Sequence, residues 1–89
     1  MNRLAQAANI ARFAGKLPAN ARSTMQFRPL PNGGIAAQAT SAGRVTGSFA
    51  VYEKQIDENG NSVQFTKTTY DPFGTIINVK DKIHGGVVP

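Results

Sequence analysis

The chain carries few side chains that can do acid–base or metal chemistry. Its 89 residues include one histidine, His84, five acids and no cysteine. A disulfide framework, a cysteine-rich zinc module and a nuclease built on two histidines are therefore excluded. Three of the acids, Asp57, Glu58 and Asp71, fall in predicted turns, where hydrogen bonding to the backbone accounts for them. Because metal-dependent phosphodiester chemistry needs converging carboxylates or histidines, we expect no metal ion and no other cofactor.

Positive charge is gathered in the first half of the chain. The formal net charge is +5, yet residues 1–44 contain six lysines and arginines and no acid. Residues 45–89 balance four lysines against five acids. The planar guanidinium of arginine fits phosphate, and a field of one sign speeds the encounter with a polyanion. We therefore expect a nucleic acid as ligand or substrate; an acidic protein partner and a basic segment without a specific role are the alternatives.

Cleavage of RNA without a metal requires only a few protein groups. The nucleophile is the substrate's own 2′-hydroxyl, so the protein must supply a base, a cation for the phosphate and a proton donor for the leaving oxygen. DNA lacks this hydroxyl and is excluded as a substrate by this route. Either His84 or Glu53 can transfer protons. The predicted catalytic residues are Arg44, Thr68, Tyr70, Lys80 and His84, and the predicted RNA-binding residues are Arg22, Arg28 and Lys67.

The first half of the chain offers one helix to position these groups. Residues 3–14 place Leu4, Ala8 and Ala11 on one stripe, which is typical of an amphipathic helix. Gly15 fits the position just beyond the helix, and Pro18 prevents continuation. We expect a basic helical arm over residues 1–27. Residues 28–48 are rich in Pro, Gly, Ala, Ser and Thr and predict a long loop or extended segment, with a short strand near residues 35–39.

The second half predicts an antiparallel meander of three strands, at residues 49–56, 62–70 and 75–80. Asn59-Gly60 favours a type I′ hairpin turn, and Asp71-Pro72-Phe73-Gly74 favours a type I turn followed by a left-handed glycine. These turns pair Lys54 with Phe65, Ile56 with Val63, Tyr70 with Ile76, Thr68 with Asn78 and Thr66 with Lys80. The predicted core face carries Ala50, Tyr52, Ile56, Val63, Phe65, Ile77 and Val79. The predicted polar face carries Glu53, Gln55, Gln64, Thr66, Thr68, Tyr70, Asn78 and Lys80.

Length and composition indicate a single small domain over residues 1–89, since two independent cores need roughly 100 residues or more. Twelve of the apolar residues are alanine, so the core is thin. No apolar run approaches the roughly 18 residues of a membrane span. The expected fold class is α+β, with the helical segment packed on the antiparallel meander of residues 49–84. At the level of fold, barnase-like and RelE-like ribonucleases are the analogy.

Two runs of the second half resemble the C-terminal toxin domains of bacterial polymorphic toxins, the variable tips of contact-dependent growth-inhibition and Rhs effectors. The first is Gly43-Arg44-Val45-Thr46-Gly47-Ser48-Phe49-Ala50-Val51-Tyr52-Glu53-Lys54. The second is Thr66-Lys67-Thr68-Thr69-Tyr70-Asp71-Pro72-Phe73-Gly74-Thr75-Ile76-Ile77-Asn78-Val79-Lys80-Asp81-Lys82. The resemblance covers roughly residues 30–84. Such domains often have a histidine before the Val-Lys-Asp segment, where this chain has Asn78.

The resemblance implies a small ribonuclease that cleaves transfer RNA. It also implies an acidic cognate immunity protein that holds the toxin inactive, and elongation factor Tu as a further partner. The domain would be delivered from the surface of a producing bacterium and act in the cytoplasm of the target cell. The alternative hypothesis is a non-catalytic basic module that binds nucleic acid or an acidic protein.

Overall fold

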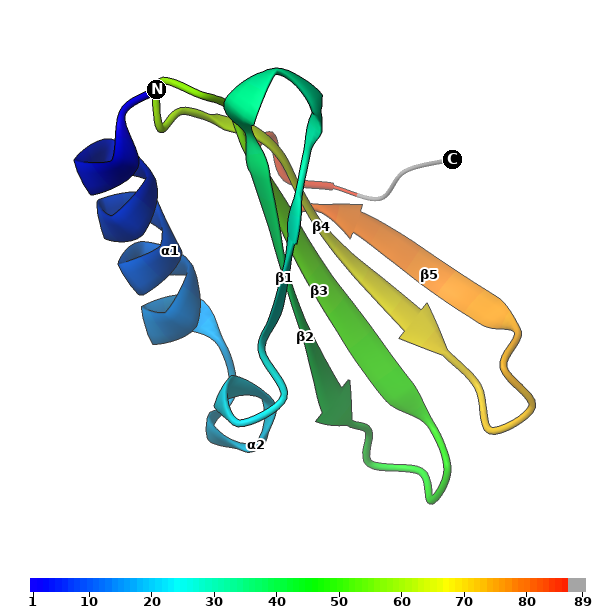
Figure 1. Ribbon diagram of the computed structural model, residues 1–89. Coiled ribbons are helices and arrows are strands. Elements are labelled where there is room, and N and C mark those ends of the chain that lie inside the picture. The colour runs from blue at the N-terminus through cyan, green and yellow to red at the C-terminus, as the bar shows by residue number, and fades with distance from the viewer. Residues whose placement is uncertain (87–89) are drawn as a thin grey trace.

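The computed structural model describes residues 1–86 and shows a helical layer on one face of a five-stranded antiparallel sheet (Figure 1). The strands neighbour one another in the order β1-β2-β3-β4-β5. The elements are α1 Arg3–Lys16, α2 Ala19–Arg22, β1 Gln26–Pro29, the 3-10 turn η1 Pro31–Gly33, β2 Ile35–Ala42, β3 Phe49–Ile56, β4 Ser62–Tyr70 and β5 Ile76–Asp81. The predicted α+β class is confirmed, although the sheet has five strands instead of three. Among the described residues, no helix has the length and apolar character needed to cross a membrane.

The two additional strands lie where the sequence predicted mostly loop. β1 pairs with β2, and β2 pairs along its whole length with β3. Alanine is a weak strand former, so composition gives little sign of β2. Its small size matters here, because Ala37 and Ala39 are buried in the same core cluster as Leu17 and Ala21 of the helical layer. Close packing under the helices, and not strand propensity, therefore explains this part of the sheet.

Helix α1 begins at an asparagine cap and ends two residues later than predicted. The side chain of Asn2 accepts a hydrogen bond from the N–H of Ala5 at 3.0 Å, which satisfies one of the free donors at the start of a helix. The helix continues through Gly15 to Lys16, so Gly15 is not the residue beyond its end. Pro18 follows in extended conformation and takes the N-cap position before α2.

The face on which α1 packs differs from the predicted apolar stripe. Its buried residues are Gln6, Asn9 and Phe13, whereas Leu4 is 86% exposed. Phe13 meets Phe65 of β4 edge-on, with ring centroids 5.4 Å apart and an interplanar angle of 71°. This is a favoured geometry for aromatic pairs. The helix is therefore held by one aromatic contact and two buried amides.

Those two amides attach α1 to the loops at one end of the sheet. The side-chain N–H groups of Gln6 and Asn9 donate to four acceptors at 2.9–3.1 Å: the carbonyls of Gly33, Asp57 and Gly60 and the hydroxyl of Ser62. These bonds satisfy the amide N–H groups, as buried donors require, while Asn9 Oδ1 is buried without a partner among the described residues. The acceptors are loop groups distant in sequence, which explains why an apolar periodicity did not identify this face.

Both hairpin turns of the meander are built on the same aspartate-capped loop. In the β3–β4 turn, Asp57 Oδ1 accepts from the N–H groups of Asn59 and Asn61 at 3.0 and 2.8 Å. In the β4–β5 turn, Asp71 Oδ1 accepts from the second and fourth residues after it, both at 2.9 Å. Gly60 has positive φ but Asn59 does not. A type I′ turn needs positive φ at both residues, so the predicted type I′ turn is wrong. The β3–β4 loop instead follows the pattern predicted for Asp71-Pro72-Phe73-Gly74.

A one-residue irregularity in each hairpin changes the predicted register. Lys54 pairs with Phe65 as expected, but Ile56 pairs with Ser62, so Val63 is displaced and 58% exposed. Tyr70 pairs with Ile76 as expected, after which the register shifts by one residue. Such a shift exchanges the faces of every later residue.

The shift moves three residues of β5 to faces other than those predicted. Thr69 pairs with Asn78, Thr68 with Val79, and Lys67 with Lys80. Lys80 and Asn78 therefore lie on the helix side of the sheet, and Val79 lies on the face away from the helices. Ile77, predicted for the core, is 61% exposed.

Substitution of Gly60 tests how closely α1 approaches the β3–β4 turn. Gly60 and Gly74 occupy equivalent turn positions with φ of +88° and +83°, but a Cβ at Gly60 would collide with Ala5, whereas one at Gly74 would meet nothing. Gly74→Ala should cost about 1–2 kcal/mol from backbone strain alone. Gly60→Ala should cost about 1–3 kcal/mol more, because the helix must move. Urea unfolding of the two variants measures the difference; equal losses would contradict this packing.

Candidate functional site

The structure does not bring the five predicted catalytic residues together. Thr68 and Tyr70 lie on β4 and face away from the helices, whereas Lys80 lies on the helix side. Arg44 lies in the loop between β2 and β3, at the end of the sheet where β5 begins. His84 follows the other end of β5. The placement of Lys80 beside Thr68 and Tyr70 is therefore wrong, while the catalytic roles themselves remain predictions.

The sheet face away from the helices, which we call the open face, holds an ion pair in its centre. Arg28 of β1 reaches across β2, and its Nη1 donates to Glu53 Oε1 at 2.9 Å. The other oxygen of Glu53 accepts from the Gln55 amide at 3.2 Å. The Arg28 side chain is 53% exposed, so its remaining N–H groups are open to solvent. A carboxylate and a guanidinium therefore stand side by side on an uncovered surface.

Hydroxyl groups surround a shallow hollow next to this pair. The hollow measures about 390 Å³, and its lining includes Glu53, Thr66, Thr68 and Tyr70. Tyr70 stacks on Phe49 of β3, with centroids 4.8 Å apart and an interplanar angle of 14°. Both rings are half-buried, so they form a firm aromatic edge to the open face. Partly exposed aromatic faces are the surfaces on which nucleic acid bases stack.

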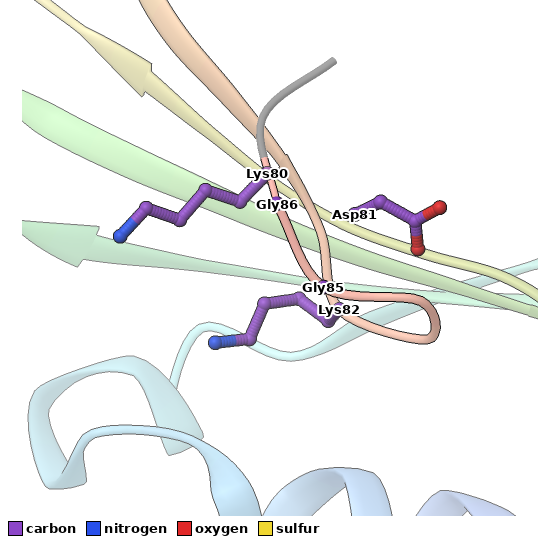
Figure 2. A pocket seen from close by; sticks show the side chains of 5 residues that line it. All are labelled: Lys80, Asp81, Lys82, Gly85 and Gly86. Carbon is purple, nitrogen blue, oxygen red and sulfur yellow. The ribbon is translucent and has the colours of Figure 1, made fainter.

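The helix side of strands β3 to β5 carries a second group of charges, which we call the lysine face. It consists of Lys54, Lys67, Lys80 and Lys82, interleaved with Tyr52 and Phe65. Figure 2 shows the side chains of Lys80 and Lys82 extending to the same side of the chain, while Asp81 between them points the opposite way. A pocket of about 370 Å³ lies between this segment and the glycines that follow it.

Lys54 is the most unusual of these cations. It is only 4% exposed, and its ammonium lies 5.3 Å from the centroid of the Phe65 ring. Burial lowers the pKa of Lys54, and the nearby charges of Lys16 and Arg12 lower it further. Because the folded pKa lies below the unfolded one, the charged form opposes folding, and this penalty decreases as the pH rises through the folded pKa.

The single histidine is engaged in a turn at the end of β5. His84 Nδ1 lies 2.8 Å from Asp81 Oδ2. Asp81 Oδ1 accepts from the backbone N–H groups of Ile83 and His84 at 2.9 and 3.1 Å. The hydrogen bond from the His84 side chain, followed by those two backbone bonds, holds the pKa of Asp81 below its usual range. This third aspartate-capped turn holds the imidazole beside Asp81, which is the cross-strand neighbour of Thr66.

The three predicted RNA-binding residues have different surroundings. Arg22 Nε donates to the carbonyl of Ala14 at 3.1 Å and so closes the end of α1. Arg28 is the partner of Glu53. Lys67 places its ammonium 5.6 Å from the centroid of the Tyr52 ring. Each still presents a cation, but on three separate surfaces.

Sequence reasoning undervalued two residues of these surfaces. Glu53 is one of two proton-transfer alternatives, and its partner Arg28 lies at the start of the segment predicted as a loop, so the sequence gives no sign of their ion pair. Lys54 had a readable signal, since strict alternation in Phe49–Ile56 puts it on the same face as Tyr52 and Ile56. A charged residue at a core position of a strand indicates a special environment, because charged side chains are rarely buried.

Comparison with known proteins finds no matching family model, no significantly similar curated protein and no significantly similar solved structure. Within residues 1–86, no three His, Cys, Asp or Glu side chains gather in one group.

The His84–Asp81 contact gives a pH prediction for the C-terminal turn. Because the Asp81 pKa is lower in the folded turn, the contact favours the turn above the unfolded pKa and is lost as the pH falls through the folded value. His84→Ala should raise the Asp81 pKa toward its usual value, and the two backbone bonds should keep part of the shift. A carboxyl NMR titration measures this; an unchanged Asp81 pKa would show that the imidazole does not contribute.

Proposed function

We propose that the chain is a metal-independent ribonuclease domain that cleaves RNA on its open face. The observation that carries this proposal is the Arg28–Glu53 pair, which lies on an uncovered sheet surface beside the hydroxyls of Thr66, Thr68 and Tyr70. A base, a cation and proton donors are the three kinds of group that transesterification of RNA requires. No metal takes part in this proposal.

Each group has a defined role in the proposed reaction. The Glu53 carboxylate accepts the proton of the 2′-hydroxyl, whose oxygen attacks the neighbouring phosphorus. The bond from phosphorus to the 5′-oxygen breaks. That oxygen takes a proton from one of the hydroxyl groups that line the hollow, Tyr70 or Thr68. Arg28 keeps one N–H on Glu53 and offers the others to the phosphate, because its side chain is half exposed. The Phe49–Tyr70 stack supplies a surface for a flanking base.

The resemblance to polymorphic toxin tips extends the proposal to a biological setting. The two resembling runs, residues 43–54 and 66–82, include most of β3, all of β5 and the part of β4 that carries Thr68 and Tyr70. They therefore contribute Glu53 and most of the hollow. On this basis we propose transfer RNA as the substrate class, the cytoplasm of a target bacterium as the place of action, and an acidic immunity protein as the inhibitor. Catalytic roles for Arg44, Lys80 and His84 are not part of this mechanism.

Replacement of the proposed base is the direct test. Glu53→Gln keeps the side-chain shape and an oxygen for Arg28 but removes the proton acceptor, so RNA cleavage should fall by about 10²- to 10⁴-fold. Growth arrest on expression without an inhibitor should disappear in parallel. Glu58→Gln is the matched control, because Glu58 lies exposed in the β3–β4 turn, and it should leave both readouts unchanged.

The substrate provides an independent check on the same reaction. An RNA with a single 2′-deoxy nucleotide at the cut position should bind but resist cleavage, and a chelator should not slow the reaction on unmodified RNA. Full activity of Glu53→Gln would refute the assigned base. A wild-type protein that leaves transfer RNA and other RNA intact would refute the ribonuclease proposal as a whole.

A further inference from the structure

The lysine face is a surface of like charges arranged in two rows across the strands. In one row Lys67 has Tyr52 on one side and Lys80 on the other, as direct cross-strand neighbours. In the next row Phe65 has Lys54 on one side, and its carbonyl accepts from the backbone N–H of Lys82 at 2.7 Å. Directly opposed like charges destabilise a sheet. The arrangement therefore opposes folding unless an anion is present.

No carboxylate neutralises these lysines within residues 1–86. Glu53 faces the other side of the sheet, where it pairs with Arg28. Three further acids lie in the hairpin turns, and Asp81 turns away from its lysine neighbours to meet His84 (Figure 2). The ammonium groups of Lys54 and Lys67 lie near aromatic rings instead. Cation–π contacts hold these side chains in place without removing their charge.

The edge of the helical layer adds to the same surface. Lys16 and Arg12 of α1 lie close enough to Lys54 to lower its pKa. An open hollow of about 520 Å³ lies between the end of α1 and the strands, lined by Lys16, Leu17, Pro18, Tyr52, Phe65 and Lys82. Its wall thus combines cations with the apolar side chains of Leu17 and Pro18. Such a wall fits a sugar or base beside its phosphate better than it fits a carboxylate side chain.

We propose that the lysine face is a second nucleic-acid surface, which binds the phosphate backbone of a single RNA strand on the side of the sheet opposite the open face. A backbone with one charge per nucleotide matches closely spaced cations, whereas acidic side chains on a protein must be held together against their own repulsion. Lysine suits this role because its ammonium is a compact point charge that binds phosphate without base readout. The binding is therefore sequence-independent and strongly dependent on salt.

The proposal is tested with a labelled single-stranded 2′-O-methyl RNA, which carries the backbone but no free 2′-hydroxyl. Binding is measured over a series of salt concentrations, so the outcome does not depend on cleavage. Lys67→Gln/Lys80→Gln should weaken binding and flatten the plot of log K against log salt by about 1.4, or about 0.7 for each phosphate that the variant no longer neutralises. Arg3→Gln removes one charge from another surface and should flatten the plot much less than Lys80→Gln does alone.

A third variant separates binding from folding. Lys54→Met removes the buried charge and keeps an unbranched side chain of similar length. The melting temperature should therefore rise while RNA affinity falls. These opposite changes distinguish a binding residue from a structural one. A fall in melting temperature, or an unchanged affinity, would overturn the role given to Lys54.

Three outcomes would overturn the proposal as a whole. Equal losses of affinity for Lys80→Gln and Arg3→Gln would show that only net charge matters. Unchanged binding by the lysine pair would place the RNA elsewhere. A polyglutamate peptide that binds as tightly as the RNA, with the same dependence on Lys67 and Lys80, would identify an acidic protein as the partner.

The two proposals can also fail separately. Weaker binding by Lys67→Gln/Lys80→Gln, together with unchanged cleavage by Glu53→Gln, would support this surface and refute the proposed base.

Discussion

The architecture depends on the way α1 is docked by two amides at one end of the sheet. Gln6 and Asn9 bind the carbonyls of the loops around Gly33 and Gly60, and Gly60 allows the helix to approach where a Cβ would not fit. The helical layer then packs against small residues of β2 and β3 and reaches β4 at Phe65. The rest of the helix side of β4 and β5 stays uncovered, and so does the whole opposite face. Both proposed surfaces follow from this one-sided contact.

The sequence predicted the local features of the meander and missed the features that depend on distant contacts. The strands at Phe49–Ile56 and Ser62–Tyr70 were predicted with the correct bounds, because alternation and turn residues are local signals. β2 was predicted only in part, as a short strand near residues 35–39, because its alanines become strand residues beneath Leu17 and Ala21. Prediction of the site from the sequence failed at the register of β5. The one-residue shift after Tyr70 decides on which side of the sheet Lys80 lies, and turn preferences do not reveal this shift.

The two faces of the sheet offer different chemistry. The open face holds a carboxylate and several hydroxyls within one hollow, with the Arg28 guanidinium bound to that carboxylate, which suits proton transfer at a phosphodiester. The lysine face holds cations that lack an acidic partner among the described residues, which suits attraction of a backbone. Because the two faces lie on opposite sides of one sheet, the lysines can attract RNA without lying next to Glu53, the proposed base. The cost is a buried, desolvated Lys54 and a direct Lys67–Lys80 pair, which the aromatic rings only partly offset.

The central claim is that RNA occupies the open face, and side-chain NMR tests it most directly. Thr66 and Thr68 of β4 lie on this face, while Thr69 of the same strand lies on the helix side and reports RNA bound to the lysine face. Titration with the non-cleavable 2′-O-methyl RNA should shift the methyl signals of Thr66 and Thr68 and the ring signals of Tyr70 in step with binding. Saturated binding with these three side chains unmoved would contradict the account.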